Sequence, residues 1–235
     1  MGFDGPSGEM VARGVSLIMP APRTALLAGA SGLVGGHCLR LLLAEPAYGR
    51  VIALGRRALP LQHAKLEQKL VDFAHIADLV PRVDDVYCCL GTTIKKAGSQ
   101  ATFRKVDHDY VVALAQAAKQ SGARRFLLVS AIGANPRSRV FYSRVKGETE
   151  RDVSAVAFAA VHIFRPSMLL GDRAESRLGE GLSLPVFRML TPLLAGPLRP
   201  YRAIAAETVA RAMIRAALGD TTGVRVHRYD EMTAG

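Results

Sequence analysis

The sequence predicts a single α/β domain: a doubly wound, mostly parallel sheet of about seven strands with helices on both faces. Two patterns in the 235 residues support this prediction. Short apolar runs recur along the chain, and several are apolar throughout, as strands buried on both faces must be. Helical apolar spacing fills the intervals, and alternating strands and helices imply right-handed parallel crossovers. A chain of this length suits one sizeable core better than two.

Seven apolar runs have the length of strands. The expected strands are Thr24–Ala30, Arg50–Gly55, Glu67–Asp72, Asp85–Leu90, Arg125–Ala131, Val161–Arg165 and Val224–Tyr229. Between the fourth and fifth runs, Phe103, Val106, Tyr110 and Leu114 recur at steps of three and four. This spacing predicts an amphipathic helix over Gln100–Ala118, which could also serve a homodimer.

The two ends of the chain add little to this core. Residues 1–22 look like an N-terminal extension, so the domain is expected over 23–235, and native translation could begin at Met19. The extension has no long apolar core and no small-residue cleavage site, which argues against a secretory signal. Helical stretches at 183–196 and 206–218 leave a small cap region. No run is long enough to span a bilayer, so we expect a cytoplasmic protein without a membrane partner.

Charge and cysteines narrow the possible partners. The net charge is +11, but the arginines are dispersed and no run of five basic residues occurs, which argues against nucleic acid as a partner. Cys88 and Cys89 are adjacent in a strand and point to opposite faces, so they are poor disulfide partners. Buried thiols in a reducing cytosol explain them better than a redox role.

A glycine-rich turn predicts a dinucleotide site. In "LLAGASGLVGG", an apolar strand enters a turn and then a helix near Leu33, with Gly29, Gly32 and Gly35 spaced three apart. Such glycines allow a sharp turn, a close approach of a ligand to backbone N–H groups, and tight packing of helix on strand. The positive end of the new helix suits a pyrophosphate.

The choice of cofactor should lie at the end of the second strand, where a carboxylate would bind a bare ribose 2′-hydroxyl. Here the strand ends in Arg56 and Arg57 with no carboxylate beside them. Two guanidinium groups suit a 2′-phosphate, so NADP(H) is expected rather than NAD(H). The alternative is a pair of solvated loop arginines.

Two further strand ends fall where the adenosine half of the cofactor would lie. Asp72 and Phe73 close the third expected strand, and Asp72 could accept from the adenine amino group. The fourth strand closes with Leu90, Gly91 and Thr92, where Gly91 would let the backbone approach the ribose phosphates. Asp and Gly also end strands for local reasons, so these residues gain their meaning from the topology.

Three residues could carry hydride-transfer chemistry. Tyr142 and Lys146 are four apart at the start of an expected helix, so both side chains share one face. A tyrosine is a poor acid near neutral pH, but a lysine ammonium nearby stabilises the phenolate and helps proton transfer. Ser130 ends the fifth expected strand beside the groove. We therefore expect Ser130 to orient a substrate carbonyl, Tyr142 to donate the proton, and Lys146 to bind the ribose and tune Tyr142.

Other polar clusters have simpler explanations. Asp107, His108 and Asp109 are consecutive helix positions that point around the axis, so a solvated helix face is expected rather than a metal site. The six histidines show no zinc-ligand spacing. The loop at 171–177, "GDRAESR", within an irregular excursion from Pro166 to about Pro185, would hang over the nicotinamide end as a lid or a solvated loop.

The glycine turn and the serine, tyrosine and lysine trio resemble the short-chain dehydrogenase/reductase superfamily in its atypical branch. More narrowly, "CCLGTT", "KAGSQATFRKVDHDYV", "YSRVKGETE" and "FRPSMLLGDRAESRLGE" are similar to the oxidoreductases related to the human Tat-interacting protein, from about Thr24 to Ala217. The resemblance implies a Rossmann fold that binds NADP(H). The contacts that it implies are Gly29, Ser31, Leu33, Val34, Arg56, Arg57, Asp72, Leu90, Gly91, Thr92, Tyr142 and Lys146, with backbone near Pro166 to Met168 at the nicotinamide amide.

Three functions compete at this point. The first is an NADPH-dependent reductase of a small-molecule carbonyl compound, whose identity the sequence does not give. The second is a regulatory protein that senses the dinucleotide and passes its redox state to a protein partner without turnover. The third is an epimerase or dehydratase that keeps NAD through its cycle, which Arg56 and Arg57 disfavour.

Overall fold

The computed structural model describes residues 21–170, 199 and 201–234. Its main sheet has seven strands in the order β3-β2-β1-β4-β5-β6-β9, and every neighbouring pair is parallel. The strands are β1 Arg23–Ala28, β2 Tyr48–Gly55, β3 Leu66–Leu70, β4 Asp85–Cys88, β5 Arg125–Val129, β6 Ala160–Phe164 and β9 Gly223–His227. The doubly wound fold class is therefore confirmed. Strand order reverses between β1 and β4, and ligands of such sheets bind at the carboxyl edge beside that point.

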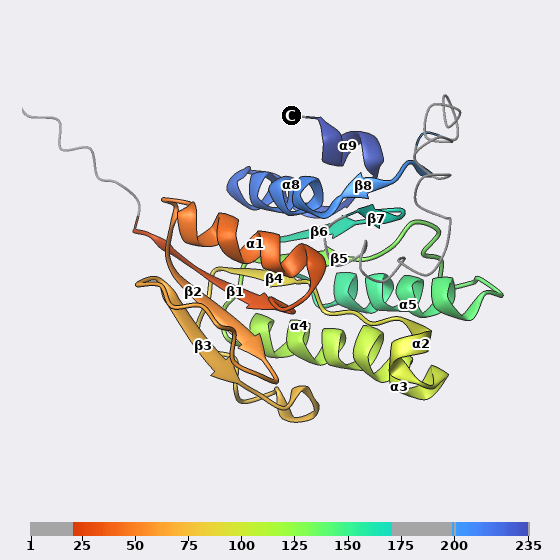
Figure 1. Cartoon of the computed structure of the whole chain (residues 1–235), viewed down its shortest axis with the longest axis horizontal. Helices are drawn as coiled ribbons and strands as arrows, with labels where there is room; N and C mark the ends of the chain where they lie inside the picture. The colour runs from red at the N-terminus through yellow and green to blue at the C-terminus, as the bar shows by residue number, and fades with distance from the viewer. Residues whose placement is uncertain (1–20, 171–198, 200, 235) are drawn as a thin grey trace, which may run out of the picture.

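Helices cover both faces of the sheet (Figure 1). On one face lie α1 (Leu33–Ala44), α8 (Ala206–Leu218) and the short α9 (Tyr229–Thr233); on the other lie α4 (Tyr110–Gln120) and α5 (Phe141–Ala155). Two apolar clusters fill the spaces. Side chains such as Leu27, Leu42 and Met213 form one beneath α1 and α8, while Leu26, Leu114 and Val153 form the other beneath α4 and α5. Alternate residues of β1 thus serve opposite faces.

The helix expected over Gln100–Ala118 is interrupted. It consists of α3 (Gln100–Arg104), a π-helical turn over Lys105–Asp109, and then α4, with the single turn α2 (Ile94–Ala97) before it. A π turn inserts an extra residue into the helical register and changes the direction of the side chains that it contains. The apolar spacing predicted the helix but not this local irregularity.

Strand ends also differ from expectation. β1, β4 and β5 stop about two residues early because the backbone turns away at their carboxyl ends, as at Gly29, whose φ is +87°. A short 3-10 helix, Phe73–His75, follows β3. Within the expected excursion, β7 (Leu169–Leu170) pairs in parallel with β8 (Ile204–Ala205). The extension, the loop at 171–177 and the stretch at 183–196 lie outside the described residues, except that residues 21 and 22 are described.

Cys88 and Cys89 point to opposite faces of the sheet. Cys88 belongs to the cluster beneath α4 and α5, whereas Cys89 packs on the other cluster, so the prediction of opposite faces is confirmed. Cys89 instead faces Cys38 of α1 across 4.0 Å between the sulfur atoms, and both are free thiols.

Among the described residues, no helix is both long enough and apolar enough to cross a membrane.

Candidate functional site

The glycine turn between β1 and α1 is shaped by close backbone contacts. A Cβ atom on Gly29 would lie 2.4 Å from the carbonyl oxygen of Cys89, and one on Gly35 would lie 2.1 Å from that of Gly29. Neither position tolerates a side chain, so these glycines bring β1, β4 and α1 together. Gly32 is exposed at the start of α1, and its N–H donates to the Gly29 oxygen at 2.9 Å.

The first turn of α1 can hold a phosphate. Its N-cap is Gly32, so no side chain caps the helix, and no acidic residue lies in the first turn. Helix N-terminal N–H groups without such a cap are ready donors for an anion. Ser31 is exposed beside this turn, while Leu33 is half-buried and Val34 is buried in the core.

Arg56 and Arg57 follow β2 at the same edge of the sheet. Both are exposed, and neither makes an ion pair or a hydrogen bond within the described part of the chain. Arg50, six residues earlier, is by contrast paired with Glu67 on β3. The two guanidinium groups after β2 therefore keep all their donors for a ligand or for water.

The residues after β3 are only partly as expected. The Asp72 carboxylate is exposed and caps the 3-10 helix by accepting from the Ala74 N–H at 3.0 Å, and this bond, with a smaller contribution from His75, lowers the pKa of Asp72. Phe73 is buried and stacks on Tyr110, with ring centroids 5.9 Å apart. Its side chain is therefore part of the core, and only its backbone remains for a cofactor contact.

Tyr142 and Lys146 lie at the amino end of α5, as the sequence predicts. The Tyr142 ring packs against Phe103, with centroids 5.5 Å apart. One residue beyond Lys146, Gly147 lets the loop after β5 lie directly on α5, because a Cβ there would come within 2.2 Å of the Asn135 backbone. The loop is held further by the Asn135 N–H, which donates to the Ser143 oxygen at 3.0 Å. The amino end of α5 is thus fixed.

Asp107 is the functional candidate that the sequence reasoning missed. The expectation of a solvated face is wrong for this residue: the π turn places its side chain in the interior, 1 % exposed. One carboxylate oxygen, Oδ2, accepts from the Thr92 N–H at 2.8 Å, and the other, Oδ1, lies 2.7 Å from Lys146 Nζ. His108 bridges Asp109 and Asp152 on α5, and only Asp109 is exposed. The sequence contains a signal for the burial of Asp107, because it lies four residues from the buried Phe103 and from the buried Val111, on the same helix face.

The ion pair keeps Lys146 charged despite its burial. Burial lowers the pKa of Lys146, but the Asp107 carboxylate and the nearby Tyr142 phenol raise it by more, so the pKa lies above its usual value. Lys146 is therefore positively charged at neutral pH, and its ammonium lies near Tyr142 and Gly91. A Cβ on Gly91 would lie 3.4 Å from Asp107 Oδ1 and 3.8 Å from Lys146 Nζ.

The structure does not direct Ser130 to the same point. Its hydroxyl donates to Glu150 Oε1 at 2.5 Å, and that carboxylate is in turn paired with Arg165, which donates from Nε at 2.9 Å. A serine hydroxyl has one hydrogen to give, so in this arrangement Ser130 has none for a carbonyl oxygen. Ser130 thus belongs to a buried cluster that ties β5, α5 and the end of β6 together, and its expected role of orienting the substrate stays a prediction.

The backbone segment that follows β6 lies at the carboxyl edge of the sheet, like the residues above. The Pro166 oxygen accepts from the Ile132 N–H, and the Met168 oxygen accepts from the Ile204 N–H, each at 2.9 Å. Pro166 is buried and Met168 is half-buried. These bonds fix the segment that would face the nicotinamide, between the loop after β5 and the pair β7-β8.

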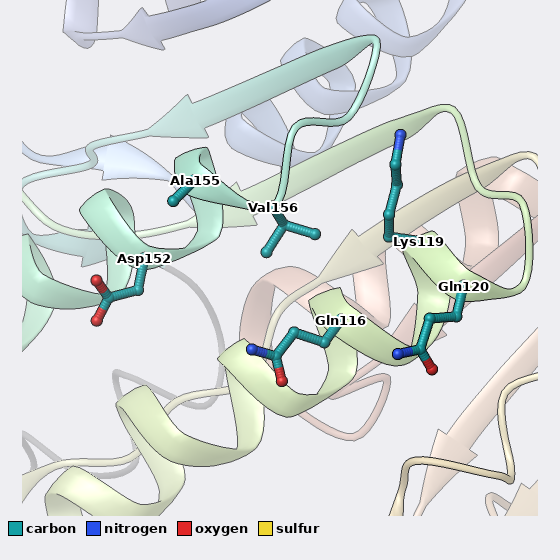
Figure 2. A pocket seen from close by; sticks show the side chains of 6 residues that line it. All are labelled: Gln116, Lys119, Gln120, Asp152, Ala155 and Val156. Atoms are coloured by element: carbon teal, nitrogen blue, oxygen red, sulfur yellow. The ribbon is translucent and has the colours of Figure 1, made fainter.

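A surface cavity elsewhere is unrelated to this site. It lies between the carboxyl-terminal halves of α4 and α5, which run back toward the amino edge of the sheet (Figure 2). Its lining consists of Gln116, Lys119, Gln120, Asp152, Ala155 and Val156. The described residues contain no cluster of three or more His, Cys, Asp or Glu side chains that could hold a metal ion.

The residues at the carboxyl edge fit a phosphorylated dinucleotide. The bare glycine turn and the uncapped α1 suit a pyrophosphate, Gly91 leaves the backbone open, and Lys146 supplies a buried positive charge. Tyr142 adds a phenol that can give a proton. The arrangement as a whole can bind a nicotinamide coenzyme and protonate an atom beside it.

Comparison with known proteins agrees with this geometry. A family model described as NAD(P)H-binding matches residues 29–172. The chain is 37 % identical over 198 residues to Protein HTATIP2 of Rattus norvegicus, covering 82 % of this chain and 80 % of that protein. It is 39 % identical over 165 residues to Protein FMP52, mitochondrial, of Eremothecium gossypii, covering 69 % and 74 %.

Solved structures share the fold at lower identity. MoeE5 in complex with UDP-glucose and NAD has a TM-score of 0.66 at 18 % identity, covering 89 % of this chain and 79 % of that one. The Bordetella bronchiseptica enzyme WbmH in complex with NAD+ has a TM-score of 0.64 at 18 % identity, covering 88 % and 75 %. With the glycine turn, the parallel sheet and the family match in agreement, the chain belongs to the NAD(P)H-binding family of Rossmann-fold proteins and is a homologue of HTATIP2 and FMP52.

Proposed function

We propose that this protein is an NADP(H)-dependent oxidoreductase of the atypical short-chain dehydrogenase/reductase type that reduces a small carbonyl compound. The observation that carries the proposal is the placement of Tyr142 beside the buried Lys146–Asp107 ion pair at the carboxyl edge of the sheet. A buried ammonium beside a phenol is the arrangement that proton donation by a tyrosine near neutral pH requires. Arg56 and Arg57, exposed and without partners in the described chain, support NADP(H) over NAD(H).

The residues divide the chemistry between them. Bound NADPH supplies a hydride to the carbonyl carbon. Tyr142 donates its phenolic proton to the carbonyl oxygen, so that the product is an alcohol and the phenol is left as a phenolate. Lys146 stabilises that phenolate by its charge and takes part in holding the ribose.

The test is NADPH oxidation with a panel of aldehydes, ketones and quinones, followed at the absorbance of the reduced nicotinamide. We expect at least one substrate, and we expect Tyr142→Phe to reduce turnover on the order of a hundredfold or more although the variant still binds NADPH. Full activity of Tyr142→Phe on every accepted substrate would contradict the assigned role of the phenol.

One observation favours a second candidate. The Ser130 hydroxyl is committed to Glu150, so the described site lacks the donor that was expected to orient a carbonyl. A protein that binds NADPH to report redox state to a protein partner needs no such donor. Tight NADPH binding with no turnover of any compound, and no effect of Tyr142→Phe, would favour this sensor. The epimerase-like alternative rests on fold alone, since the solved UDP-sugar epimerases that share this fold, such as UDP-glucuronic acid 4-epimerase from Bacillus cereus, are below 20 % identical to this chain.

A cytoplasmic location also remains a proposal. It rests on the sequence, and the fungal relatives carry the word mitochondrial in their names. A homodimer likewise remains a proposal, to be checked by sedimentation, and the apolar residues of the amphipathic pattern, such as Phe103 and Leu114, are already buried within this chain.

A further inference from the structure

A buried carboxylate oxygen at the candidate site has acceptor capacity left. Asp107 Oδ1 is fully buried, and its close polar neighbour is the Lys146 ammonium, with Nζ 2.7 Å away. A carboxylate oxygen has two lone pairs, so the ammonium leaves one of them for a further donor. At the edge where such sheets bind ligands, this oxygen is placed to accept from a ligand.

The exposed residue next to this oxygen is Gly91. Gly91 is exposed, and the position of its missing Cβ lies 3.4 Å from Asp107 Oδ1 and 3.8 Å from Lys146 Nζ. An acceptor and a cationic donor therefore face the same point, just beyond the carboxyl end of β4. Neighbouring hydroxyl groups on a sugar ring can meet both, one by donating and the other by accepting.

The orientation of the carboxylate is fixed from the other side. Oδ2 accepts from the Thr92 N–H at 2.8 Å, which prevents Asp107 from turning Oδ1 away from Gly91. Lys146 compensates the negative charge, so an anionic ligand is not repelled as it would be by a lone carboxylate.

We propose that Asp107 is a ligand-binding residue whose Oδ1 accepts a hydrogen bond from a ribose hydroxyl of the coenzyme, while Lys146 donates to the neighbouring hydroxyl. The ribose is that of the nicotinamide half, because Lys146 and Tyr142 share one end of α5. Gly91, which the sequence analysis expects at the adenosine half, would then face the nicotinamide ribose instead. This inference rests on the proposed function, since it takes the ligand to be NADP(H). Asp107 thus adds a hydrogen-bond acceptor to a coenzyme site whose other proposed contacts are hydrogen-bond donors.

The test compares two ligands by calorimetry. NADPH contains the nicotinamide ribose, whereas 2′,5′-ADP contains only the phosphorylated adenosine half. Asp107→Asn keeps the size of the side chain and the acceptor for Thr92, but it replaces Oδ1 by an amide nitrogen that donates. We expect its affinity for NADPH to fall roughly tenfold or more, as for a lost bond to a charged group, with affinity for 2′,5′-ADP unchanged within about twofold.

A matched control lies two residues away. Asp109→Asn makes the same chemical change at an exposed position that contacts His108 instead of the groove, so it should leave both affinities unchanged. Thermal melting of both variants verifies that they are folded.

A second variant covers the case in which Asp107→Asn does not fold. In Gly91→Ala, the added methyl group makes only ordinary contacts in the free protein, yet it covers Oδ1 and Nζ without changing either charge. It should weaken NADPH about tenfold and spare 2′,5′-ADP.

The outcomes separate clearly. Equal NADPH affinity for Asp107→Asn and Asp109→Asn, or no loss in Gly91→Ala, overturns the proposal. Parallel losses for NADPH and 2′,5′-ADP also overturn it, because they indicate a contact in the adenosine half or a structural role. If the unaltered protein binds neither ligand, it is the proposed function that fails.

Discussion

Two buried carboxylates at opposite ends of the sheet have different surroundings. Asp85, the first residue of β4, is fully buried and receives donors on both oxygens: the Tyr48 hydroxyl at 2.6 Å, Arg23 at 3.0 Å and Arg125 at 3.3 Å. Asp107, near the carboxyl end of the same strand, receives the Thr92 N–H on Oδ2 and the Lys146 ammonium beside Oδ1, where one lone pair remains.

The difference teaches how to distinguish stabilising from functional acids. A buried carboxylate whose acceptor capacity is filled from within the fold has nothing left for a ligand. Around Asp85, the burial of Tyr48, together with the negative charge of the carboxylate, raises the pKa of Tyr48 well above its usual value. A buried carboxylate that can still accept a hydrogen bond, and that lies at the carboxyl edge where such sheets bind ligands, is placed to bind a ligand. Asp85 should therefore matter for folding and Asp107 for the coenzyme.

The largest expected effect comes from Asp85→Asn. Loss of the charge leaves Arg23 and Arg125 without their buried counter-ion, so the free energy of unfolding should fall by about 3 kcal/mol or more. Urea denaturation measures it. NADPH affinity of the folded variant should be unchanged, and a loss of stability below about 1 kcal/mol would show that the filled carboxylate is not a main stabilising group.

A second buried group without a full set of partners sharpens the comparison, because it lies away from the site. His162 Nε2 on β6 has no hydrogen bond, and Nδ1 lies 3.0 Å from His227 Nε2. Burial, with His227, Arg125 and Arg225 nearby, lowers the pKa of His162 to about 4. The unfolded chain then binds more protons between about pH 6.5 and 4, so stability falls as the pH falls through that window.

We expect this histidine to contribute an acid-dependent loss of about 2 kcal/mol between those pH values. Denaturation of the natural protein and of His162→Gln across the same pH range isolates the contribution. Identical pH dependence of stability in both proteins would contradict this contribution of His162. A change in the NADPH affinity of His162→Gln would show that a buried polar atom away from the carboxyl edge of the sheet also affects ligand binding.

The smallest effect concerns the arginine pair. Arg56→Ala with Arg57→Ala should weaken NADPH binding about tenfold, or about 1.4 kcal/mol, while hardly changing NADH binding, because only the 2′-phosphate loses its partners. Calorimetry with both coenzymes measures the ratio. Equal losses for the two would refute the preference for NADP(H).

The periodic parts of this fold could be predicted from sequence. Seven apolar runs and the spacing of Phe103, Tyr110 and Leu114 located the strands and helices, because burial on a sheet imposes a regular pattern. Strand ends were placed too late, since the turn at Gly29 is decided by contact with Cys89 on another strand. The pair β7-β8 is too short to produce a pattern.

The site could be predicted only where a local motif carries it. Tyr142 and Lys146 share a helix face by spacing alone, and their position is as expected. The direction of Ser130 depends on Glu150 and Arg165, which are distant in sequence. The apolar spacing indicates that Asp107 faces inward, but its ion pair with Lys146 depends on how the π turn packs against α5. Side-chain direction at strand ends and helix irregularities is set by tertiary contacts.

Thermal melting with and without saturating NADPH tests the contrast between the two carboxylates most directly, since a bound ligand raises stability according to its affinity. The account predicts that Asp85→Asn melts far lower than the natural protein but gains as much from NADPH. Asp107→Asn should instead lose most of the NADPH-induced shift. An unchanged shift in Asp107→Asn, or a vanished shift in folded Asp85→Asn, would contradict the account.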